Sequence, residues 1–368
     1  MNLKQPKFIL SGGGTGGHIF PAVAIANALR ETYPDAEILF VGANGKMEME
    51  KVPAAGYKII GLDIRGIQRK LSPKNLTLPF VLLKALRRAG KIVDDFKPAV
   101  AIGVGGYASG ALLYMASRKN VPTLIQEQNS YAGITNKVLG KRVNTICVAY
   151  PGMEKFFPAS KIVLSGNPVR KDLLQPVSKT EALQFFGLSA DKPTLLVVGG
   201  SLGAKSVNES IRAALPSLRE QGIQLIWQTG NPYREQAESA LQETRSEGFV
   251  TRAFIPEMQM AYAAADLVVS RAGALAVAEI CLLGKASVLV PYPFASEDHQ
   301  TKNAKALADE DAAVLIADHQ AATQLEQAIH ELMADKSRRD ALSARVKKFG
   351  KPDATDIIVK EVQKLMAL

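Results

Sequence analysis

The chain has 368 residues, 47% of them hydrophobic, which is enough for two domains of ordinary size. Its two cysteines, Cys147 and Cys281, lie in apolar runs without the spacing of a metal site or a disulfide framework, so both are expected in the core. No stretch approaches the length of a membrane-spanning helix and no signal-peptide pattern opens the chain, which predicts a cytoplasmic protein.

The net charge of +10 is concentrated in the first half of the chain. Residues 1–166 carry 22 Lys and Arg against 10 Asp and Glu, whereas residues 167–368 carry 23 against 25. A basic first half and a nearly neutral second half predict an anionic partner for the first half alone.

A glycine-rich loop follows the first apolar run and precedes an amphipathic segment. Five of the six residues from Gly12 to Gly17 are glycine, with a hydroxyl at Thr15 and a titratable ring at His18. Such a loop lets backbone N–H groups approach an anion. The spacing also fits a dinucleotide fingerprint, but no carboxylate ends the second strand, 37–44, so we expect the loop to face phosphate. A tight turn without a ligand is the alternative.

Apolar runs that alternate with helical patterns predict a parallel, doubly wound α/β sheet in each half of the chain. In the first half the runs lie at 8–10, 38–41, 59–61, 100–103, 123–125, 145–148 and 162–165. Gly166 and Pro168 make a plausible linker. In the second half the runs lie at 194–198, 225–228, 250–254, 267–270, 287–290 and 314–316.

The segment 64–93 holds eight basic residues and no acidic one. Its expected helix, 79–93, is apolar over the first turns and basic afterwards, so it can insert at a bilayer surface while its cations meet anionic headgroups. The residues placed in this membrane patch are Leu76, Phe80, Leu83, Lys84, Arg87 and Arg88. A buried helix with solvated charges fits equally well. A nucleic-acid surface fits less well, because the segment has one Phe and no stacking series of aromatics.

Further polar loops follow other strands of the first half. A second glycine-rich loop, 103–110, opens a helix that Ser109 is expected to cap. Another strand ends in a polar cluster containing Glu127 and Asn129. Because the carboxyl ends of neighbouring parallel strands meet at one edge of a sheet, these loops predict one shared ligand cleft.

The second half repeats this pattern with a glycine loop at 199–204. Glu279 lies two turns into a helix of Ala and Leu, where a carboxylate is costly unless it binds something such as ribose hydroxyls. His299, Gln300 and Asn303 supply donors and acceptors of the kind that bind sugar hydroxyls. Taken singly, each of these residues also fits a helix cap or an exposed polar position.

Taken together, the motifs resemble the MurG family of peptidoglycan glycosyltransferases over nearly the whole chain. The matching motifs, in the family's order, are Gly12–His18 with Pro21, Gly105–Gly110, Glu127–Asn129, Gly166–Arg170, Gly199–Ala204, Ser270–Ala274, and Asp298–Gln300 with Asn303. Gln126 departs from the family, which usually has His there. The resemblance implies a GT-B fold. Two Rossmann-like domains, 1–166 and 167–352, would face each other across a cleft, and a C-terminal helix over about 353–368 would pack back on the first.

The resemblance implies an inverting hexosyltransferase that moves N-acetylglucosamine from UDP-N-acetylglucosamine to the 4-hydroxyl of the muramoyl sugar of lipid I. The product would be lipid II, used in peptidoglycan and cell wall biosynthesis and hence in cell shape and division. The implied donor contacts are Thr15, Gly16, Gly17, Asn129, Arg170, Ser201, the backbone of Ile255, Glu279, His299, Gln300 and Asn303. The implied contacts of the acceptor pyrophosphate are Gly13, Gly14, Gly105, Gly106, Tyr107 and Ser109.

The family also implies a peripheral position on the cytoplasmic face of the inner membrane. Anionic phospholipid and other cell-wall synthesis proteins would then be partners, and nucleic acid would not.

The implied reaction needs a base that takes the proton of the attacking hydroxyl. His18 is the first candidate, because an unperturbed imidazole titrates near working pH, and Glu127 is the second. Arg170 and the helix start at 201–204 would stabilise the departing diphosphate, so we expect no metal and no other cofactor. The acidic run 309–311 mimics a metal-binding motif, but we expect it in a solvated turn.

Two other classes of protein compete with this interpretation. A UDP-N-acetylglucosamine 2-epimerase would share the donor site but would need neither a lipid acceptor nor a basic apolar patch. A non-enzymatic anion-binding or nucleic-acid-binding protein would share the basic half, but would leave Glu279 and the polar cluster at 299–303 without a purpose.

Overall fold

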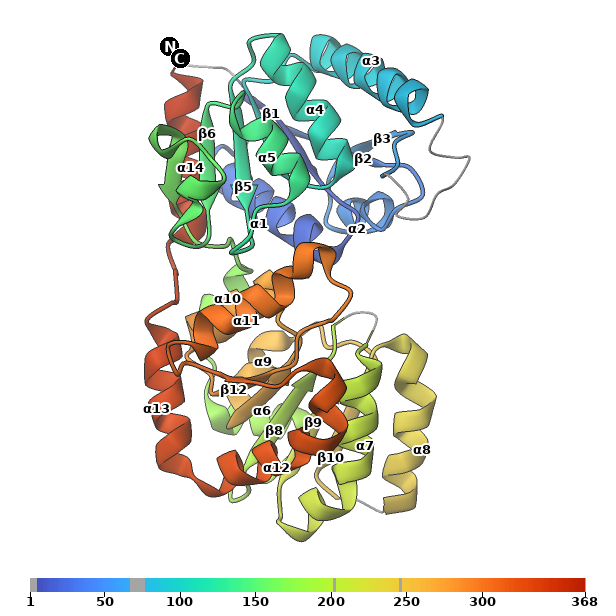
Figure 1. Ribbon diagram of the computed structural model, residues 1–368, viewed down its shortest axis with the longest axis vertical. Helices are drawn as coiled ribbons and strands as arrows, with labels where there is room; N and C mark the ends of the chain where they lie inside the picture. Colours follow the sequence, from blue (N-terminus) through green and yellow to red (C-terminus); the bar gives the residue numbers. More distant parts are fainter. Residues whose placement is uncertain (1–4, 67–76, 201–202, 245–246, 368) are drawn as a thin grey trace. The chain divides into compact units, whose positions relative to one another are not determined.

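The structure, a computed structural model, describes residues 5–66, 77–200, 203–244 and 247–367 (Figure 1). The chain divides into two compact units, Met1–Arg170 with Pro352–Leu368, and Lys171–Lys351. The division falls after Arg170 and not, as expected, after residue 166. Hydrogen bonds explain the difference. Gln126 Nε2 donates to Asn167 Oδ1 at 2.9 Å, and Asn167 Nδ2 donates to the carbonyl of Gln128 at 3.0 Å, which ties this segment to the first unit.

The first unit contains a parallel sheet with the strand order β3-β2-β1-β4-β5-β6-β7. Its strands are β1 (Lys7–Gly12), β2 (Glu37–Ala43), β3 (Lys58–Leu62), β4 (Val100–Gly105), β5 (Thr123–Glu127), β6 (Thr145–Val148) and β7 (Ile162–Leu164). They correspond to the seven apolar runs predicted in this half. β1, β4 and β5 are neighbours, so the two glycine loops and the polar cluster after β5 leave the same edge of the sheet.

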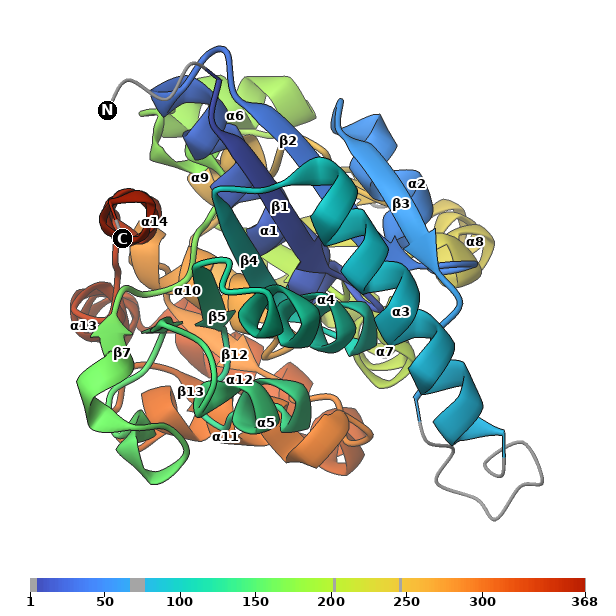
Figure 2. The ribbon, with the colours of Figure 1, turned by 90° about the horizontal axis from the view of Figure 1, so that it is seen from above.

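Helices cover both faces of this sheet (Figure 2). One face carries α3 (Leu78–Phe96), α4 (Tyr107–Arg118) and α5 (Ile134–Gly140). The other carries α1 (Gly16–Thr32), α2 (Glu48–Ala54) and α14 (Ala354–Met366). Side chains along β1 alternate between the two faces of the sheet. Ile9 therefore packs with the first set of helices, while Phe8 and Leu10 pack with the second.

The C-terminal helix α14 belongs to the first unit, as the family resemblance implied. Its apolar side chains recur at helical spacing, and Ile358 and Val362 are fully buried. They join Ile19 and Ile25 of α1 in one core cluster. The last segment of the chain therefore completes a core that the first segment begins.

The second unit contains a parallel sheet with the order β10-β9-β8-β11-β12-β13. Its strands are β8 (Thr194–Val198), β9 (Gln224–Gln228), β10 (Phe249–Arg252), β11 (Leu267–Ser270), β12 (Ser287–Leu289) and β13 (Val314–Leu315). Its helices are α6 (Lys179–Phe186), α7 (Lys205–Glu220), α8 (Arg234–Thr244), α9 (Met258–Ala264), α10 (Ala274–Leu283), α11 (His299–Ala308), α12 (Ala321–Ala334) and α13 (Lys336–Lys347). The predicted second doubly wound sheet is thus confirmed.

Both cysteines are buried and unpaired, as expected, and burial raises the pKa of each thiol to about 12. Within the described ranges, no helix combines the length and the apolar character needed to cross a bilayer.

Candidate active site

The two glycine loops of the first unit lie directly against each other. The N–H of Gly13 donates to the carbonyl of Gly105 over a long 3.4 Å, and a Cβ added at Gly106 would lie 2.8 Å from the carbonyl oxygen of Gly13. Gly105 and Gly106 have φ angles of +115° and +92°, which residues with a side chain rarely adopt. This confirms that the loops after β1 and β4 come together, and it shows why both must be glycine.

A carboxylate that the sequence reasoning missed lies beneath the first loop. Glu48, in the first turn of α2, is 1% exposed and accepts the N–H of Gly14 at 2.9 Å and the N–H of Ala43 at 3.0 Å. A Cβ at Gly13 would lie 2.2 Å from Glu48 Oε1, so the carboxylate fills the space that glycine leaves. A carboxylate from α2 therefore does lie at the end of β2, and its hydrogen-bond partners are backbone N–H groups of Gly14 and Ala43. An acidic residue at a helix start is too common to have signalled this.

Glu48 takes up part of the hydrogen-bonding capacity of the first loop. The N–H groups of Gly13 and Gly14 both donate within the fold, and the contact of these two residues with the acceptor pyrophosphate stays a prediction. Gly106 and Tyr107 lie at the start of α4, where the positive end of the helix dipole favours an anion, and their contact with the acceptor pyrophosphate stays a prediction. Tyr107 is 57% exposed.

Ser109 is neither the cap of α4 nor an exposed ligand. The helix begins two residues before it, with Gly106 as the N-cap, so no side-chain cap is formed. Ser109 is fully buried, and a Cβ added at Gly103 would lie 2.5 Å from its hydroxyl. The predicted cap is therefore wrong, whereas the predicted contact of Ser109 with the acceptor pyrophosphate stays a prediction.

His18 is held in one tautomer by the first loop. Its Nδ1 lies 3.0 Å from the carbonyl oxygen of Gly13, and since a carbonyl only accepts, Nδ1 carries the proton of the neutral ring. The lone pair is then on Nε2. The ring packs against Gly105, where an added Cβ would lie 2.8 Å from Nε2. His18 thus has the geometry of a base.

Glu127, the second candidate base, has a different environment. It is 1% exposed, and its oxygens accept from four donors. These are the backbone N–H groups of Asn129 and Gly133 and the side-chain amides of Asn129 and Asn136, at 2.9–3.2 Å. A carboxylate so fully hydrogen-bonded organises the loop after β5, and the assignment of the base to His18 or Glu127 stays a prediction.

The other residues of the first unit that are predicted to contact the UDP-sugar lie near α1, in the loop after β5 and at the end of the unit. Thr15 is exposed at the N-cap of α1, Gly16 and Gly17 form its first turn, and Asn129 is held by Glu127. Arg170 is half-buried where the unit ends. Two expected site residues, Ser201 and Leu76, lie outside the described residues.

In the second unit, two predicted residues lie around the start of α10. Asn303 is fully buried and donates to the carbonyl of Ala272 at 3.3 Å. Gln300 accepts the N–H of Tyr292 at 2.9 Å, and its Nε2 lies 4.0 Å from where a Cβ of Gly273 would be. α10 and α11 pack together, so these amides border one helix start.

Three other donor residues sit at defined places in the second unit. The N–H of Ile255 donates to Gln228 Oε1 at 2.9 Å. This hydrogen bond fixes the backbone that is expected to contact the uracil. Glu279 Oε2 accepts the hydroxyl of Tyr262 at 3.0 Å, so the carboxylate is oriented before any ligand binds. His299 begins α11. The acidic run 309–311 is exposed in a turn after α11, as expected.

The contact between Glu48 and Gly13 yields a stability prediction. Gly13→Ala places a Cβ into the Glu48 carboxylate and should lower the free energy of unfolding by about 1–3 kcal/mol. Gly17→Ala is the matched control, because its Cβ would meet only Thr15 Oγ1 at 3.7 Å and Ala is favoured in a helix. Urea unfolding followed by circular dichroism measures both. Equal effects of the two changes would contradict the buried position of Glu48.

Comparison with known proteins gives the family. Residues 8–148 match the glycosyltransferase family 28 N-terminal domain, and residues 194–358 match the glycosyltransferase family 28 C-terminal domain. A "UDP-N-acetylglucosamine--N-acetylmuramyl-(pentapeptide) pyrophosphoryl-undecaprenol N-acetylglucosamine transferase" of Parabacteroides distasonis is 53% identical over 99% of each chain. A relative from Cytophaga hutchinsonii with the same name is 54% identical over 98% of this chain and 96% of its own.

Two solved structures have a fold similar to that of this chain. The crystal structure of Acinetobacter baumannii MurG matches with a TM-score of 0.78 and 32% identity, over 98% of this chain and 99% of that one. A putative UDP-N-acetylglucosamine 2-epimerase from Listeria monocytogenes matches with a TM-score of 0.66 and 14% identity, over 98% and 96%, and shares the fold alone. The expected two-domain GT-B fold is confirmed, and the chain belongs to the MurG family of glycosyltransferases.

Proposed function

We propose that this chain is an inverting hexosyltransferase that moves N-acetylglucosamine from UDP-N-acetylglucosamine to the 4-hydroxyl of the muramoyl sugar of lipid I. The observation that carries the proposal is the transferase name of relatives that are 53% and 54% identical over nearly the full chain. The epimerase alternative has only a likeness of fold, at 14% identity. The relatives' name also supports lipid I and the UDP-sugar as the two substrates.

The second unit is proposed to bind the donor. Glu279, oriented by Tyr262, would accept hydrogen bonds from ribose hydroxyls, and the backbone at Ile255 would meet the uracil. Gln300 and Asn303, on α11, would contact the sugar beside the start of α10. Arg170 would face the diphosphate, where its charge offsets the charge that develops as UDP leaves.

The first unit is proposed to supply the base and to bind the acceptor diphosphate. The acceptor 4-hydroxyl attacks the anomeric carbon of the donor sugar as the bond from that carbon to the UDP oxygen breaks. The electrons of the broken bond go to the diphosphate, and the hydroxyl proton goes to Nε2 of His18. Because Arg170 and the start of α7 would carry the charge of the leaving group, the proposed step uses no metal.

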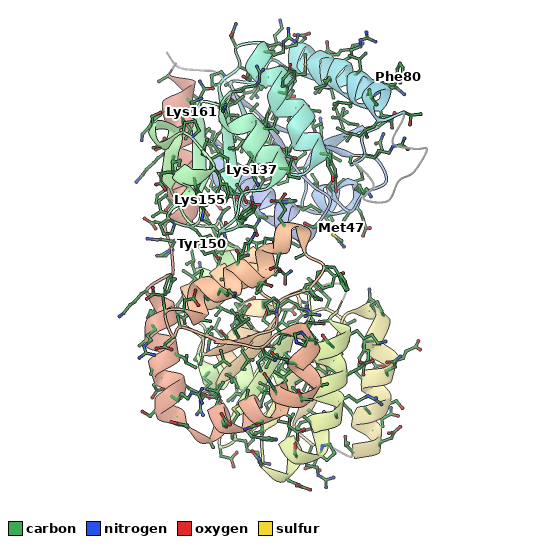
Figure 3. All side chains as sticks on the ribbon, viewed as in Figure 1. Met47, Phe80, Lys137, Tyr150, Lys155 and Lys161 are labelled. Carbon is green, nitrogen blue, oxygen red and sulfur yellow. The ribbon has the colours of Figure 1, made fainter. Side chains whose placement is uncertain are left out.

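The outer part of α3 is proposed to contact a membrane. Phe80 is 76% exposed and points away from the sheet, and Leu82 and Leu83 are 45% and 46% exposed (Figure 3). Lys84, Arg87 and Arg88 are also exposed. The opposite face of the helix, including Ala85, Ala89 and Ile92, is buried in the core.

This arrangement favours a surface helix over the buried-helix alternative. An apolar end with a basic flank suits an interface with anionic headgroups. We propose that the protein binds the cytoplasmic face of the inner membrane in this way, close to its lipid-linked acceptor and to other cell-wall synthesis proteins.

Release of UDP from UDP-N-acetylglucosamine, measured in detergent with and without a lipid I analogue, tests the activity. We expect release to depend on the acceptor and to be matched by sugar transfer to it, because the hydroxyl of the acceptor is the nucleophile. Release without acceptor, or conversion of the donor to UDP-N-acetylmannosamine, would replace the transferase with the epimerase.

Two variants, one in each unit, test whether the first unit binds the membrane and the second unit binds the donor. Arg87→Ala with Arg88→Ala should weaken binding to phosphatidylglycerol-containing vesicles by about 1 kcal/mol per residue and leave donor affinity unchanged. Glu279→Ala should weaken UDP-N-acetylglucosamine binding by a loss on the order of 1.5–3 kcal/mol and leave vesicle binding unchanged.

Lys336→Ala with Arg338→Ala, on exposed α13, controls for the loss of two charges. The reverse pattern between the Arg87→Ala, Arg88→Ala variant and the Glu279→Ala variant, or an equal loss of vesicle binding in this control, would contradict the assignment of the membrane patch.

A further inference from the structure

One peptide group lies between the carboxylate of Glu48 and the ring of His18. The N–H of Gly14 donates to Glu48 Oε2 at 2.9 Å, and the carbonyl of Gly13 accepts from His18 Nδ1 at 3.0 Å. This N–H and this carbonyl belong to the same peptide bond, between Gly13 and Gly14. The carboxylate and the imidazole therefore contact opposite ends of a single peptide dipole.

We propose that Glu48 is a positioning residue that selects the orientation of this peptide and thereby the tautomer of His18. The inference rests on the proposed function, in which Nε2 of His18 takes the proton of the attacking hydroxyl. Glu48 contacts neither substrate in this proposal. It acts on the base through the Gly13–Gly14 peptide.

The glycine loop needs such a device because its own side chains cannot orient the backbone. Gly14 has a φ angle of +85°, and a peptide between two glycines can rotate at little steric cost. The reversed peptide would present N–H to His18. Nδ1 would then have to accept, and the proton would move to Nε2, where it blocks the base. A carboxylate that accepts hydrogen bonds opposes the reversed orientation, because that orientation would turn a carbonyl toward it.

A backbone hydrogen bond and two neighbouring glycines fix the position of Glu48. Its second oxygen accepts the N–H of Ala43 at 3.0 Å, which anchors the carboxylate to β2. A Cβ at Gly42 would lie 2.6 Å from Glu48 Cγ, so this glycine as well as Gly13 makes room for the side chain. Burial of a carboxylate is unfavourable unless hydrogen bonds compensate for it, and here both compensating bonds come from the backbone next to the loop.

Histidine-selective ¹⁵N NMR on the full chain tests the proposal directly, since the chain has only four histidines. His18→Gln assigns the signals of His18 by their loss. In the wild-type protein we expect the neutral ring of His18 to carry its proton on Nδ1. A wild-type ring protonated on Nε2 would overturn the proposal, and this result does not depend on how any Glu48 variant folds.

Glu48→Gln tests the link itself. The amide keeps the shape but replaces one acceptor oxygen by a donor, so one of the two backbone N–H groups loses its partner. We expect the Nδ1–H tautomer to lose population and kcat to fall by roughly 10²-fold, with KM for the UDP-sugar unchanged, as for a misplaced catalytic group. Glu48→Asp should recover part of both. Glu50→Gln, exposed on the same helix, is the matched control and should change neither.

A double variant separates positioning from a purely structural role. In the His18→Ala background, Glu48→Gln should lower kcat little further, because Glu48 acts through the missing ring. A second full loss of kcat, or native His18 signals in a folded Glu48→Gln protein, would overturn the inference. If no sugar transfer occurs in the wild type while Glu48→Gln still shifts the tautomer, the proposed function fails and the positioning by Glu48 stands.

Discussion

Close approach of backbone to backbone at one edge of the first sheet is the constraint on which the candidate site depends. Gly13, Gly105 and Gly106 let the loops after β1 and β4 touch, and Gly13 and Gly42 leave the space that Glu48 fills. A Cβ at Gly106 would clash with the backbone of Gly13, and a Cβ at the other three glycines would clash with the side chain of Glu48 or His18. The same contacts set the carbonyl of Gly13 against His18. The glycine loop is thus partly filled by the carboxylate of Glu48, and its carbonyl at Gly13 holds the ring of His18.

The two units share one architecture but differ in charge and in the side chains they expose. The first is basic and carries exposed apolar side chains on α3, which suits a lipid-linked, anionic acceptor. The second is nearly neutral, with amides near the start of α11 and the carboxylate of Glu279 inside α10, a combination that suits a nucleotide sugar. Neither property follows from the parallel sheets themselves. Each comes from residues in the loops and helices that follow the strands.

The strands and the glycine loops could be predicted because they depend on local patterns. Continuous apolar runs predict buried parallel strands, and clustered glycines between a strand and a helix predict a loop with exposed backbone. The place of α14 came from the family resemblance, since an amphipathic pattern does not say which core the helix will join. A hydroxyl near a helix start commonly signals a cap, so the sequence predicts one at Ser109. The positive φ of Gly106 starts the helix earlier.

Long-range contacts explain what could not be predicted. Glu48 reaches the glycine loop only because α2 returns to the end of β2, and no spacing within the sequence encodes that return. The hydrogen bonds that saturate Glu127 are local, but they depend on the fold of the loop after β5, which the composition of a polar cluster does not reveal. The bond between Gln126 and Asn167 moves the domain boundary for the same reason.

The most direct test of the account is the single-turnover rate of sugar transfer to a lipid I analogue by His18→Ala, measured together with its affinity for UDP-N-acetylglucosamine. The account predicts a rate lower by about 10²–10⁴-fold with an unchanged donor affinity, because the variant loses the base and keeps the donor site in the second unit. A rate equal to that of the wild type, or a loss explained entirely by weaker donor binding, would contradict it.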